Sequence, residues 1–337
     1  MPHPETWLQV RPEGLYCEPG DFYVDPVRPV PRAVITHAHS DHARPGHGAV
    51  LATADTIALM NVRMGEGRFG ATQPLEYGQT LNLGGVHLWL APAGHVLGSA
   101  QVAMEWRGVR VVVSGDYKRQ PDPTCRPFEP IACDLFITEA TFALPVFRHP
   151  PPEEEIDKLL ESVTVFPERT HVIGAYALGK TQRLIKLLRR AGWEQPIYLH
   201  GAMQSLCDAY ERLGVALGPL LPATVQARDK LAGAIVIAPP SAITDRWARR
   251  LSDPVVCYAS GWMRVRQRAK SRGVELPLVI SDHADWDELN ATIDEVGASE
   301  VWVTHGREEA LIHETAKRGI AGRALRLVGY EEDEGET

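Results

Sequence analysis

The sequence lacks several features that would place the protein in a specialised class. Its five cysteines are odd in number and scattered, with no Cys-x-x-Cys pair, which argues against a disulfide framework and against a thiolate zinc site. No apolar run approaches the length of a membrane span, and the opening MPHPETWLQV lacks the charged-then-apolar layout of a secretion signal. We therefore expect a cytoplasmic protein with reduced cysteines.

Basic residues are outnumbered by acidic ones, with 35 Lys and Arg against 43 Asp and Glu. The formal net charge is −8, which argues mildly against an extended nucleic-acid surface, because phosphate binding needs clustered Lys and Arg. One region departs from this balance, since eight basic residues stand against two acidic ones between Thr244 and Arg272. The remaining composition, 44% hydrophobic and 23% charged over 337 residues, is ordinary for one large or two modest globular domains.

What the sequence does contain is a dense group of metal donors in the stretch PRAVITHAHSDHARPG. The apolar run from Ala33 to Thr36 predicts a buried strand that ends at His37. Period-two geometry directs His37 and His39 to one side, where two imidazoles can share an ion. Asp41 and His42 then offer a carboxylate and an imidazole to a second divalent metal. Four donors in six positions favour a metal site over a polar loop.

Further donors follow other expected strands. His95 lies in a Gly-flanked turn of LAPAGHVLGSAQVAMEW, where the backbone can approach a bound group, although a lone His in such a turn is more often structural. The apolar run from Val109 to Val113 predicts a strand that delivers Asp116 to the sheet edge reached by His37, and a turn-initiating Asp is the alternative. Three more donors stand at or just after strand-like runs, namely Glu139, His283 and His305.

The sequence changes character after Pro145. The stretch HPPPEEEIDK indicates a linker and a helix start, and alternating strand and helix patterns then predict a small α/β layer. In HVIGAYALGKTQRLIKLLRRAG the glycine spacing does not match a P-loop. Lys180 and Arg183 nevertheless lie at the start of the expected helix, where free backbone N–H groups favour an anion, so we predict a phosphate contact over a plain βα turn.

A second group of candidate substrate contacts follows the expected strand PVVCYAS. Ser260, Gly261 and Trp262 end this strand and lead into the basic run that contains Arg264. Trp262 suits stacking on a base, and burial at a domain interface is an equal alternative.

These motifs resemble those of metallo-β-lactamase-fold hydrolases, and among them the β-CASP nucleases. His-x-His-x-Asp-His, Gly-His-x-x-Gly-Ser and SGDYKR are similar to the metal motifs of the fold. TEATF, Ser-x-His-Ala-Asp and Val-x-His-Gly-Arg resemble motifs A, B and C of the β-CASP group. Within that group, THAHSDHARPGH, SGDYKR, TEATF and YALGK look most like bacterial DNA exonucleases associated with DNA ligases, which are distant relatives of Artemis-type crosslink-repair nucleases.

The resemblance implies an α/β fold, a metallo-β-lactamase αββα sandwich interrupted by a small α/β β-CASP domain. The sandwich would occupy 1–144 and 271–330, the insert 145–270, and an acidic tail 331–337. The resemblance also implies two divalent ions, Zn²⁺ or Mn²⁺, which the donor types do not separate. One would be held by His37, His39, His95 and Asp116, and the other by Asp41, His42, Asp116 and His305.

The same resemblance implies a metal-dependent exodeoxyribonuclease, in which a hydroxide activated by two metals hydrolyses phosphodiester bonds at single-stranded DNA ends. Asp41 would help to orient that nucleophile, and His283, held by Glu139, would protonate the departing 3′ oxygen. The resemblance suggests 5′ to 3′ digestion in DNA repair, with a DNA ligase and a helicase as partners. A pocket for a terminal phosphate, formed by Ser260, Lys180 and nearby backbone, would favour exonuclease action.

Three other functions stay open at this point. An RNA nuclease like ribonuclease J or the mRNA 3′-end cleavage enzymes would use the same chemistry, and the short insert favours DNA over this alternative. A thioester or lactam hydrolase is disfavoured by the insert, by the basic run and by His283. A non-catalytic scaffold is disfavoured because every expected ligand is present.

Overall fold

The computed structural model describes residues 1–223, 231–251 and 253–327, and the chain divides into two compact units. Unit 1 comprises Met1–Pro145 and the described residues from His283 onward, and unit 2 comprises Val146–Asp282. The acidic tail expected at 331–337 lies outside the described residues. Within the described ranges, every helix is too short or too polar to span a bilayer.

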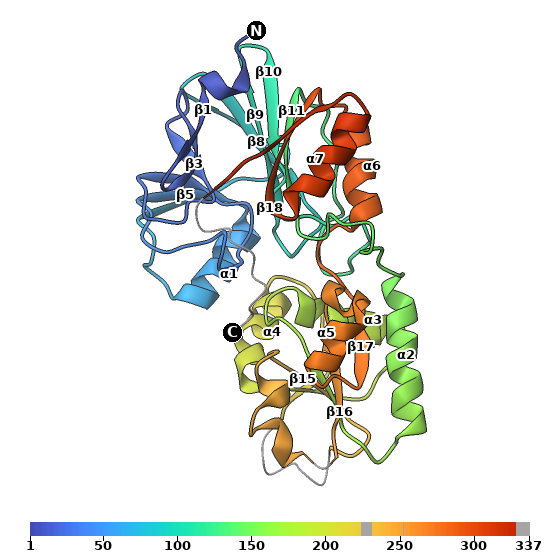
Figure 1. Cartoon of the computed structure of the whole chain (residues 1–337). Coiled ribbons are helices and arrows are strands. Elements are labelled where there is room, and N and C mark those ends of the chain that lie inside the picture. The colour runs from blue at the N-terminus through green and yellow to red at the C-terminus, as the bar shows by residue number, and fades with distance from the viewer. Residues whose placement is uncertain (224–230, 252, 328–337) are drawn as a thin grey trace. The chain divides into compact units, whose positions relative to one another are not determined.

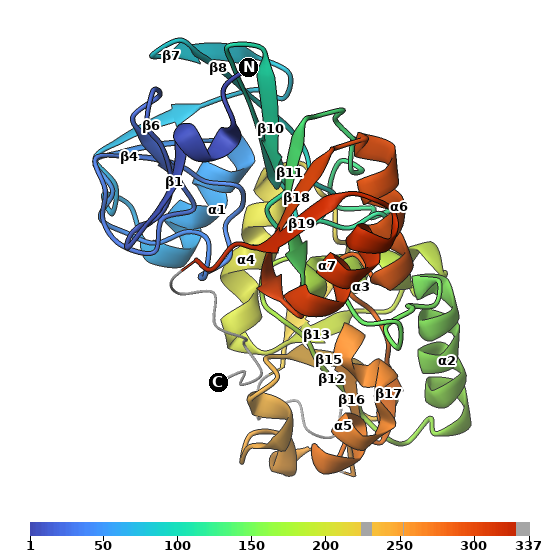
Figure 2. The ribbon, with the colours of Figure 1, turned by 45° about the horizontal axis from the view of Figure 1, so that its top comes forward.

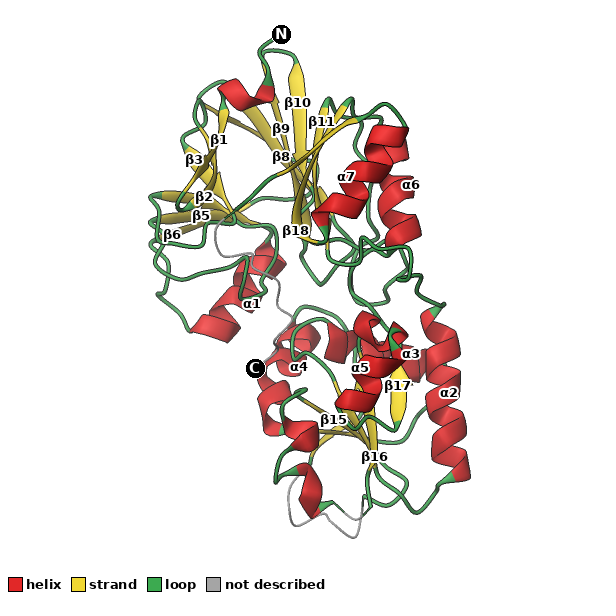
Figure 3. Ribbon diagram, in the orientation of Figure 1, coloured by secondary structure: helices red, strands yellow, loops and turns green. Residues whose placement is uncertain are grey.

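Unit 1 contains two β-sheets (Figures 1 and 3). The first has the strand order β1-β2-β3-β4-β5-β6, with the bounds Leu8–Arg11, Gly14–Cys17, Phe22–Val24, Arg32–Val34, Ala49–Ala52 and Ala71–Pro74. The second has the order β19-β18-β11-β10-β9-β8-β7. From β7 to β11 and then β18 and β19, its strands span Thr80–Leu83, Val86–Pro92, Ala100–Trp106, Val109–Val113, Leu135–Ala140, Glu300–Gly306 and Ala321–Ala324.

The second sheet separates two apolar cores, because successive residues of a strand point to opposite faces. Val111 of β10 and Ile137 of β11 lie in the core that also holds residues of the first sheet, such as Phe22. Val112 and Phe136, one position along each strand, lie in the core on the opposite face.

Three helices and a short 3₁₀ helix complete unit 1. Helices α6 and α7 supply Leu289 and Leu311 to the core on the outer face of the second sheet, and Figure 2 shows them beside β18 and β19. Helix α1 lies beside the first sheet and buries Leu59 and Met60. The bounds are Pro4–Thr6 for the 3₁₀ helix η1, Ala54–Met64 for α1, Trp286–Val296 for α6 and Glu308–Lys317 for α7.

The α/β class is therefore confirmed, and unit 1 is consistent with a metallo-β-lactamase-type fold. The strand predicted for Val109 to Val113 is β10. The strand predicted for Ala33 to Thr36 is shorter than expected, because β4 ends at Val34. The backbone N–H of Thr36 donates to the carboxylate of Asp25 at 2.8 Å instead of to a neighbouring strand.

Unit 2 is built on one sheet in which all strands pair in parallel, in the order β14-β13-β15-β12-β16-β17. From β12 to β17 the strands span His171–Gly174, Ile197–Leu199, Leu220–Pro222, Ile235–Ala238, Val255–Ala259 and Leu276–Leu278. The α-helices α2 to α5 span Pro152–Val165, Lys180–Arg190, Gly201–Arg212 and Arg266–Ser271, and the 3₁₀ helices η3 to η5 span Ala242–Thr244, Ala248–Arg250 and Gly261–Arg264.

The end of unit 2 differs from the boundary that we expected after residue 270. Strand β17 pairs with β16, with Leu276 opposite Cys257 and Leu278 opposite Ala259. This pairing completes the parallel sheet of unit 2, so the chain returns to unit 1 only at His283.

Candidate metal centre

The four donors of the first motif lie on the loop between β4 and β5 in unit 1. His37 and His42 are buried, and their rings lie 4.2 Å apart between centroids. The side chain of His37 is fixed by Thr36, whose Oγ1 lies 3.0 Å from Nδ1. Helix α1 also braces this loop, because the guanidinium of Arg63 donates to the backbone carbonyl of Ala38.

His95 reaches this loop from the turn that follows β8. Gly94 precedes it with a φ of +73°, and a Cβ there would lie 2.4 Å from the carbonyl oxygen of Lys118, so glycine is needed for the close approach. Nε2 of His95 lies 3.0 Å from Nδ1 of His39. The backbone N–H of His95 donates to Oγ of Ser99 at 3.1 Å, which fixes the turn.

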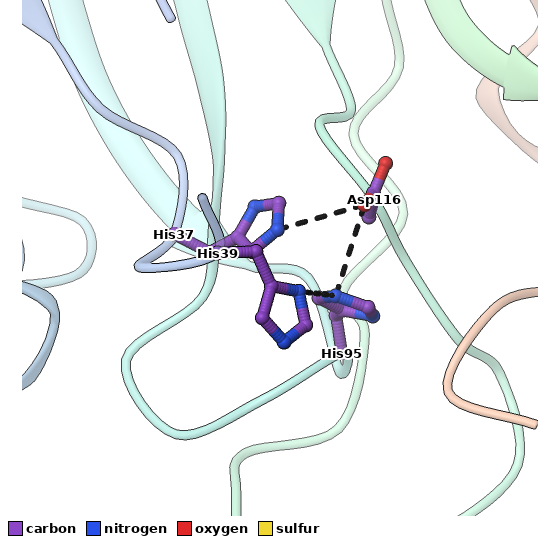
Figure 4. A group of neighbouring side chains, drawn as sticks. All are labelled: His37, His39, His95 and Asp116. Carbon is purple, nitrogen blue, oxygen red and sulfur yellow. Dashed lines mark hydrogen bonds and ion pairs between the residues drawn. The ribbon is translucent and has the colours of Figure 1, made fainter. Parts of the chain in front are cut away.

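Asp116 is the residue around which the donors gather. It follows β10, and its Oδ2 lies 3.5 Å from Nε2 of His37, 3.3 Å from Nε2 of His42 and 3.8 Å from Nε2 of His95. Its Oδ1 lies 3.7 Å from Nδ1 of His305. Figure 4 shows the carboxylate of Asp116 facing His37 and His95, with His39 against His95.

His305 reaches the site from the end of β18. Its φ is +61°, a left-handed conformation that is uncommon for residues other than glycine. The pairing of β11 with β18 changes register between Thr138 and Ala140, next to this position. Such irregularities bend a strand and redirect its side chains, which explains why the His305 ring turns toward Asp116.

Donor atoms thus gather in three groups, each with its atoms within 4.8 Å of one another. All three share Asp116, and the members are His37, His39, His95 and Asp116; Asp41, His42, Asp116 and His305; and Asp116, Glu139 and His283. The first two groups are the two ligand sets that the resemblance implied.

The chemistry of these groups fits a divalent metal. Burial and the imidazoles of His42 and His95 hold the pKa of His37 well below its usual value, so the ring is neutral and offers a nitrogen lone pair to a metal. Burial opposes ionisation of Asp116, but the imidazoles of His42 and His305 outweigh it and hold the pKa of the carboxyl well below its usual range. Among the described residues, neither Nε2 of His37 nor Oδ1 of Asp116 has a hydrogen-bond partner, although both are buried.

The third group contains the expected acid pair. Nδ1 of His283 lies 2.9 Å from Oε2 of Glu139, and the other carboxylate oxygen of Glu139 accepts the backbone N–H of Tyr117 at 2.8 Å. Glu139 is buried, whereas the His283 side chain keeps 22% of its surface exposed. The pair therefore joins a fixed carboxylate to an imidazole that is partly exposed to solvent.

The predicted substrate contacts all lie in unit 2, and their environments differ. Lys180 and Arg183 are buried and engaged by unit 2 itself, as described below. Ser260 is buried and its Oγ accepts the backbone N–H of Trp262 at 3.3 Å. Gly261 is buried and Arg264 is exposed.

Trp262 is half-buried and packs within unit 2. Its ring lies 5.1 Å from that of Phe147, and the Arg268 guanidinium lies 4.3 Å from its centroid. It borders the apolar cluster that contains Tyr258 and Met263. Stacking of this ring on a base stays a prediction.

Sequence reasoning missed Asp25, whose carboxylate holds the loop between β4 and β5 that carries His37 and His42. Its carboxylate accepts hydrogen bonds from Thr36 and contacts Nδ1 of His42 at 2.8 Å. An imidazole whose second nitrogen is held by a carboxylate is fixed in orientation and is a better metal ligand. The local signal is that Asp25 directly follows the apolar run FYV in DFYVDP, and this does not indicate which residues the carboxylate contacts.

We expect the Asp25→Asn variant to bind divalent metal about 10- to 100-fold more weakly, because it loses the charged partner of His42. Competition with a chromogenic chelator measures this affinity. Asp21→Asn is the matched control, since Asp21 is exposed and pairs with Arg32. Equal metal affinity in the two variants would contradict the role given to Asp25.

Gly115 allows the backbone before Asp116 to lie close to Thr36, which precedes His37. Its φ is +57°, and a Cβ there would lie 2.8 Å from Cβ of Thr36, which is itself held by Asp25. We expect Gly115→Ala to lower the free energy of unfolding by about 1–3 kcal/mol, measured by urea titration. Gly108→Ala is the control, because Gly108 has a φ of +79° but no neighbour within 4 Å; equal losses would show that crowding at Gly115 is unimportant.

Comparisons with known proteins agree with this site. No family model matches the chain. The chain is 28% identical over 319 residues to "Probable DNA ligase" from Opitutus terrae, covering 93% of this chain and 30% of that protein. It is 31% identical over 223 residues to "Ribonuclease TTHA0252" from Thermus thermophilus, covering 57% of this chain and 51% of the relative.

Two further similarities are more partial. "Endoribonuclease YSH1" from Saccharomyces cerevisiae is 30% identical over 125 residues, which cover 36% of this chain and 16% of that protein. The crystal structure of a protein of unknown function from Enterococcus faecalis aligns with a TM-score of 0.59 at 14% identity, covering 88% of this chain and 79% of that one, and it supports the fold alone.

The chain spans about half or less of the length of these curated relatives. The match to "Probable DNA ligase" nevertheless covers nearly the whole of this chain. The sequence comparisons therefore support the resemblance to the β-CASP nucleases of the metallo-β-lactamase fold.

Proposed function

We propose that this chain is a metal-dependent DNA exonuclease that hydrolyses phosphodiester bonds at single-stranded ends. The proposal rests on one observation: three donor groups share Asp116. Two of these groups suit metal ions, and the third contains the Glu139–His283 pair. A positioned acid suits a reaction with a poor oxygen leaving group, such as the 3′ oxygen of a nucleotide.

Two divalent ions would be held by the two ligand sets, with Asp116 common to both. Nitrogen and oxygen donors without thiolate suit Zn²⁺ or Mn²⁺. Such ions lower the pKa of water and neutralise charge that develops on a phosphate. Asp41 is the carboxylate that belongs to the second set alone, and its position beside His42, at 3.7 Å from Nε2, would let it orient an attacking water.

Residues of the protein would protonate the leaving oxygen. Glu139 holds Nδ1 of His283, so that Nε2 would pass its proton to the departing 3′ oxygen. Because the backbone N–H of Tyr117 fixes the other oxygen of Glu139, the carboxylate cannot rotate away from the imidazole. A positioned acid of this kind contributes about 10²- to 10⁴-fold to a hydrolysis rate.

The extent of the sequence matches favours DNA over RNA as the substrate. The region matched in "Probable DNA ligase" covers 93% of this chain, whereas the match to "Ribonuclease TTHA0252" covers 57%. This supports a role beside a DNA ligase in repair. The 5′ to 3′ direction and a helicase partner are proposed from the resemblance to crosslink-repair nucleases alone. The 31% identity to the ribonuclease keeps RNA cleavage as the second candidate.

We further propose that unit 2 is a β-CASP domain that binds nucleic acid. Its parallel sheet interrupts the chain between Glu139 and His283. The basic run lies in its last third, where Arg264, Arg266 and Lys270 are exposed. Exposed cations of this kind bind a phosphate backbone without reading its sequence.

A time course with Mn²⁺ tests the proposal. Single-stranded DNA labelled at the 5′ or the 3′ end, and RNA of the same sequence, are each incubated with the protein. We expect labelled mononucleotide to appear at once from the 5′-labelled DNA, and the Asp116→Asn variant serves as the control for contaminating nucleases. Faster digestion of RNA would favour the second candidate, and release of internal fragments would exclude exonuclease action.

A further inference from the structure

The segment immediately before His283 is held by ionised side chains from two helices of unit 2. Val279–Asp282 follows β17 and belongs to no helix or strand. Glu155 of α2 accepts the backbone N–H of Val279 at 2.8 Å. Lys180 of α3 donates from Nζ to the carbonyl of Ile280 at 2.9 Å.

The last two residues of the segment are held by the same helix α3. The Arg183 guanidinium donates to the backbone carbonyl of Ser281 and lies 3.6 Å from Oδ1 of Asp282. Oδ2 of Asp282 lies 3.0 Å from Nζ of Lys180. Each of four consecutive residues is therefore bound by a charged side chain.

All of these charges are buried. The exposed fraction is 5% for Glu155, 3% for Lys180, 0% for Arg183 and 3% for Asp282. Buried ion pairs contribute little to stability on balance, because removing the charges from water offsets their attraction. These side chains instead fix the path of the backbone, because their hydrogen bonds end on the successive backbone groups of Val279, Ile280 and Ser281.

We propose that Lys180, Arg183 and Asp282 are positioning residues that set the backbone from which His283 projects. His283 is the next residue after Asp282, and its Nδ1 must stay within hydrogen-bond distance of Glu139. A displacement of about 1 Å in a catalytic group can cost on the order of 100-fold in rate. This inference rests on the proposed function for its kinetic consequence, and on the hydrogen bonds alone for the ordering of the segment.

The inference gives Lys180 and Arg183 a different role from the phosphate contact expected from the sequence. A phosphate contact acts mainly through substrate binding, so its loss raises KM and lowers the salt dependence of binding. A positioning residue acts through His283, so its loss lowers kcat while KM stays close to that of the parent protein. The two roles are therefore separated by steady-state kinetics.

The experiment compares three variants of the full chain with bound Mn²⁺. Lys180→Met leaves Arg183 paired with Asp282 and is expected to fold, whereas Asp282→Asn removes the shared carboxylate. Arg169→Met is the matched control, because it removes a largely buried cation of unit 2 that pairs with Asp253 and Glu275, away from the segment. Each protein is assayed for kcat and KM on an oligonucleotide, for metal content and for amide exchange in a peptide covering 276–285.

We expect Lys180→Met and Asp282→Asn to lower kcat about 10- to 100-fold with KM within about threefold of the parent value. Amide exchange in 276–285 should rise in both variants and stay at the parent rate in Arg169→Met, with metal content equal throughout. Parent-like kcat and exchange, or a rise in KM alone, would overturn the inference. If the parent protein cleaves no nucleic acid, the proposed function fails, and the exchange data still decide whether the segment is held as proposed.

Discussion

Replacing Asp116 with asparagine is expected to abolish hydrolysis and to remove bound metal. The carboxylate faces four imidazoles, those of His37, His42, His95 and His305, at 3.3–3.8 Å. Loss of a side chain that only supports a metal ligand costs about 10- to 100-fold in affinity or activity. Loss of a donor shared by both sets should therefore cost more than about 100-fold in rate.

Metal analysis of the purified variant and its rate on labelled DNA measure the two effects together. Glu105→Gln provides a control, because Glu105 lies in the same sheet and its carboxylate pairs with Arg110 and belongs to none of the three donor groups. Asn keeps the size of the side chain, so melting temperature should reveal any general loss of folding. A variant that retained two equivalents of metal and the parent rate would remove Asp116 from the centre.

His283→Ala is expected to separate metal binding from proton transfer. The ring contacts Glu139 and belongs to the third donor group, outside the two sets that would hold metal. We expect hydrolysis to fall by about 10²- to 10⁴-fold, as for the loss of a positioned general acid. Metal content should equal that of the parent protein.

A substrate with a better leaving group makes this test sharper. A leaving oxygen that departs as a stable anion has little need of a proton, so a nitrophenyl phosphodiester should be cleaved at similar rates by the variant and the parent. His313→Ala is a suitable control, because His313 lies in the body of α7. An equal loss on both substrates would show that His283 does not act as the acid, and near-normal DNA cleavage would exclude it from the mechanism.

The sequence, read together with its resemblance to the motifs of the β-CASP nucleases, was sufficient to identify the residues that meet at the candidate metal centre. His37, Asp116 and His305 each stand at or just beyond the end of a strand-like apolar run. The ends of parallel strands in one sheet meet at one edge, and β10, β11 and β18, which lead to or carry Asp116, Glu139 and His305, are such strands. His37 was expected at this same sheet edge, but it follows β4 of the other sheet, so its approach to Asp116 depends on how the two sheets pack. Local patterns therefore helped to locate the donors, because His and Asp residues have few other roles at the ends of apolar strands.

The sequence by itself could not reveal what holds these donors in place. No motif in the sequence distinguishes Asp25 from other acidic residues. The pairing of β3 with β4 brings its carboxylate into contact with the side chains of Thr36 and His42.

Lys180 and Arg183 had the pattern of an anion site at a helix start, yet the fold of unit 2 sets Asp282 against them. Asp282 lies about a hundred residues further along the chain, and no local pattern signals which carboxylate will reach a buried cation. Strand ends and donor types were thus determined by local sequence, whereas the partners of buried charges were decided by tertiary structure, because a charge can be buried only where the whole fold supplies its partner.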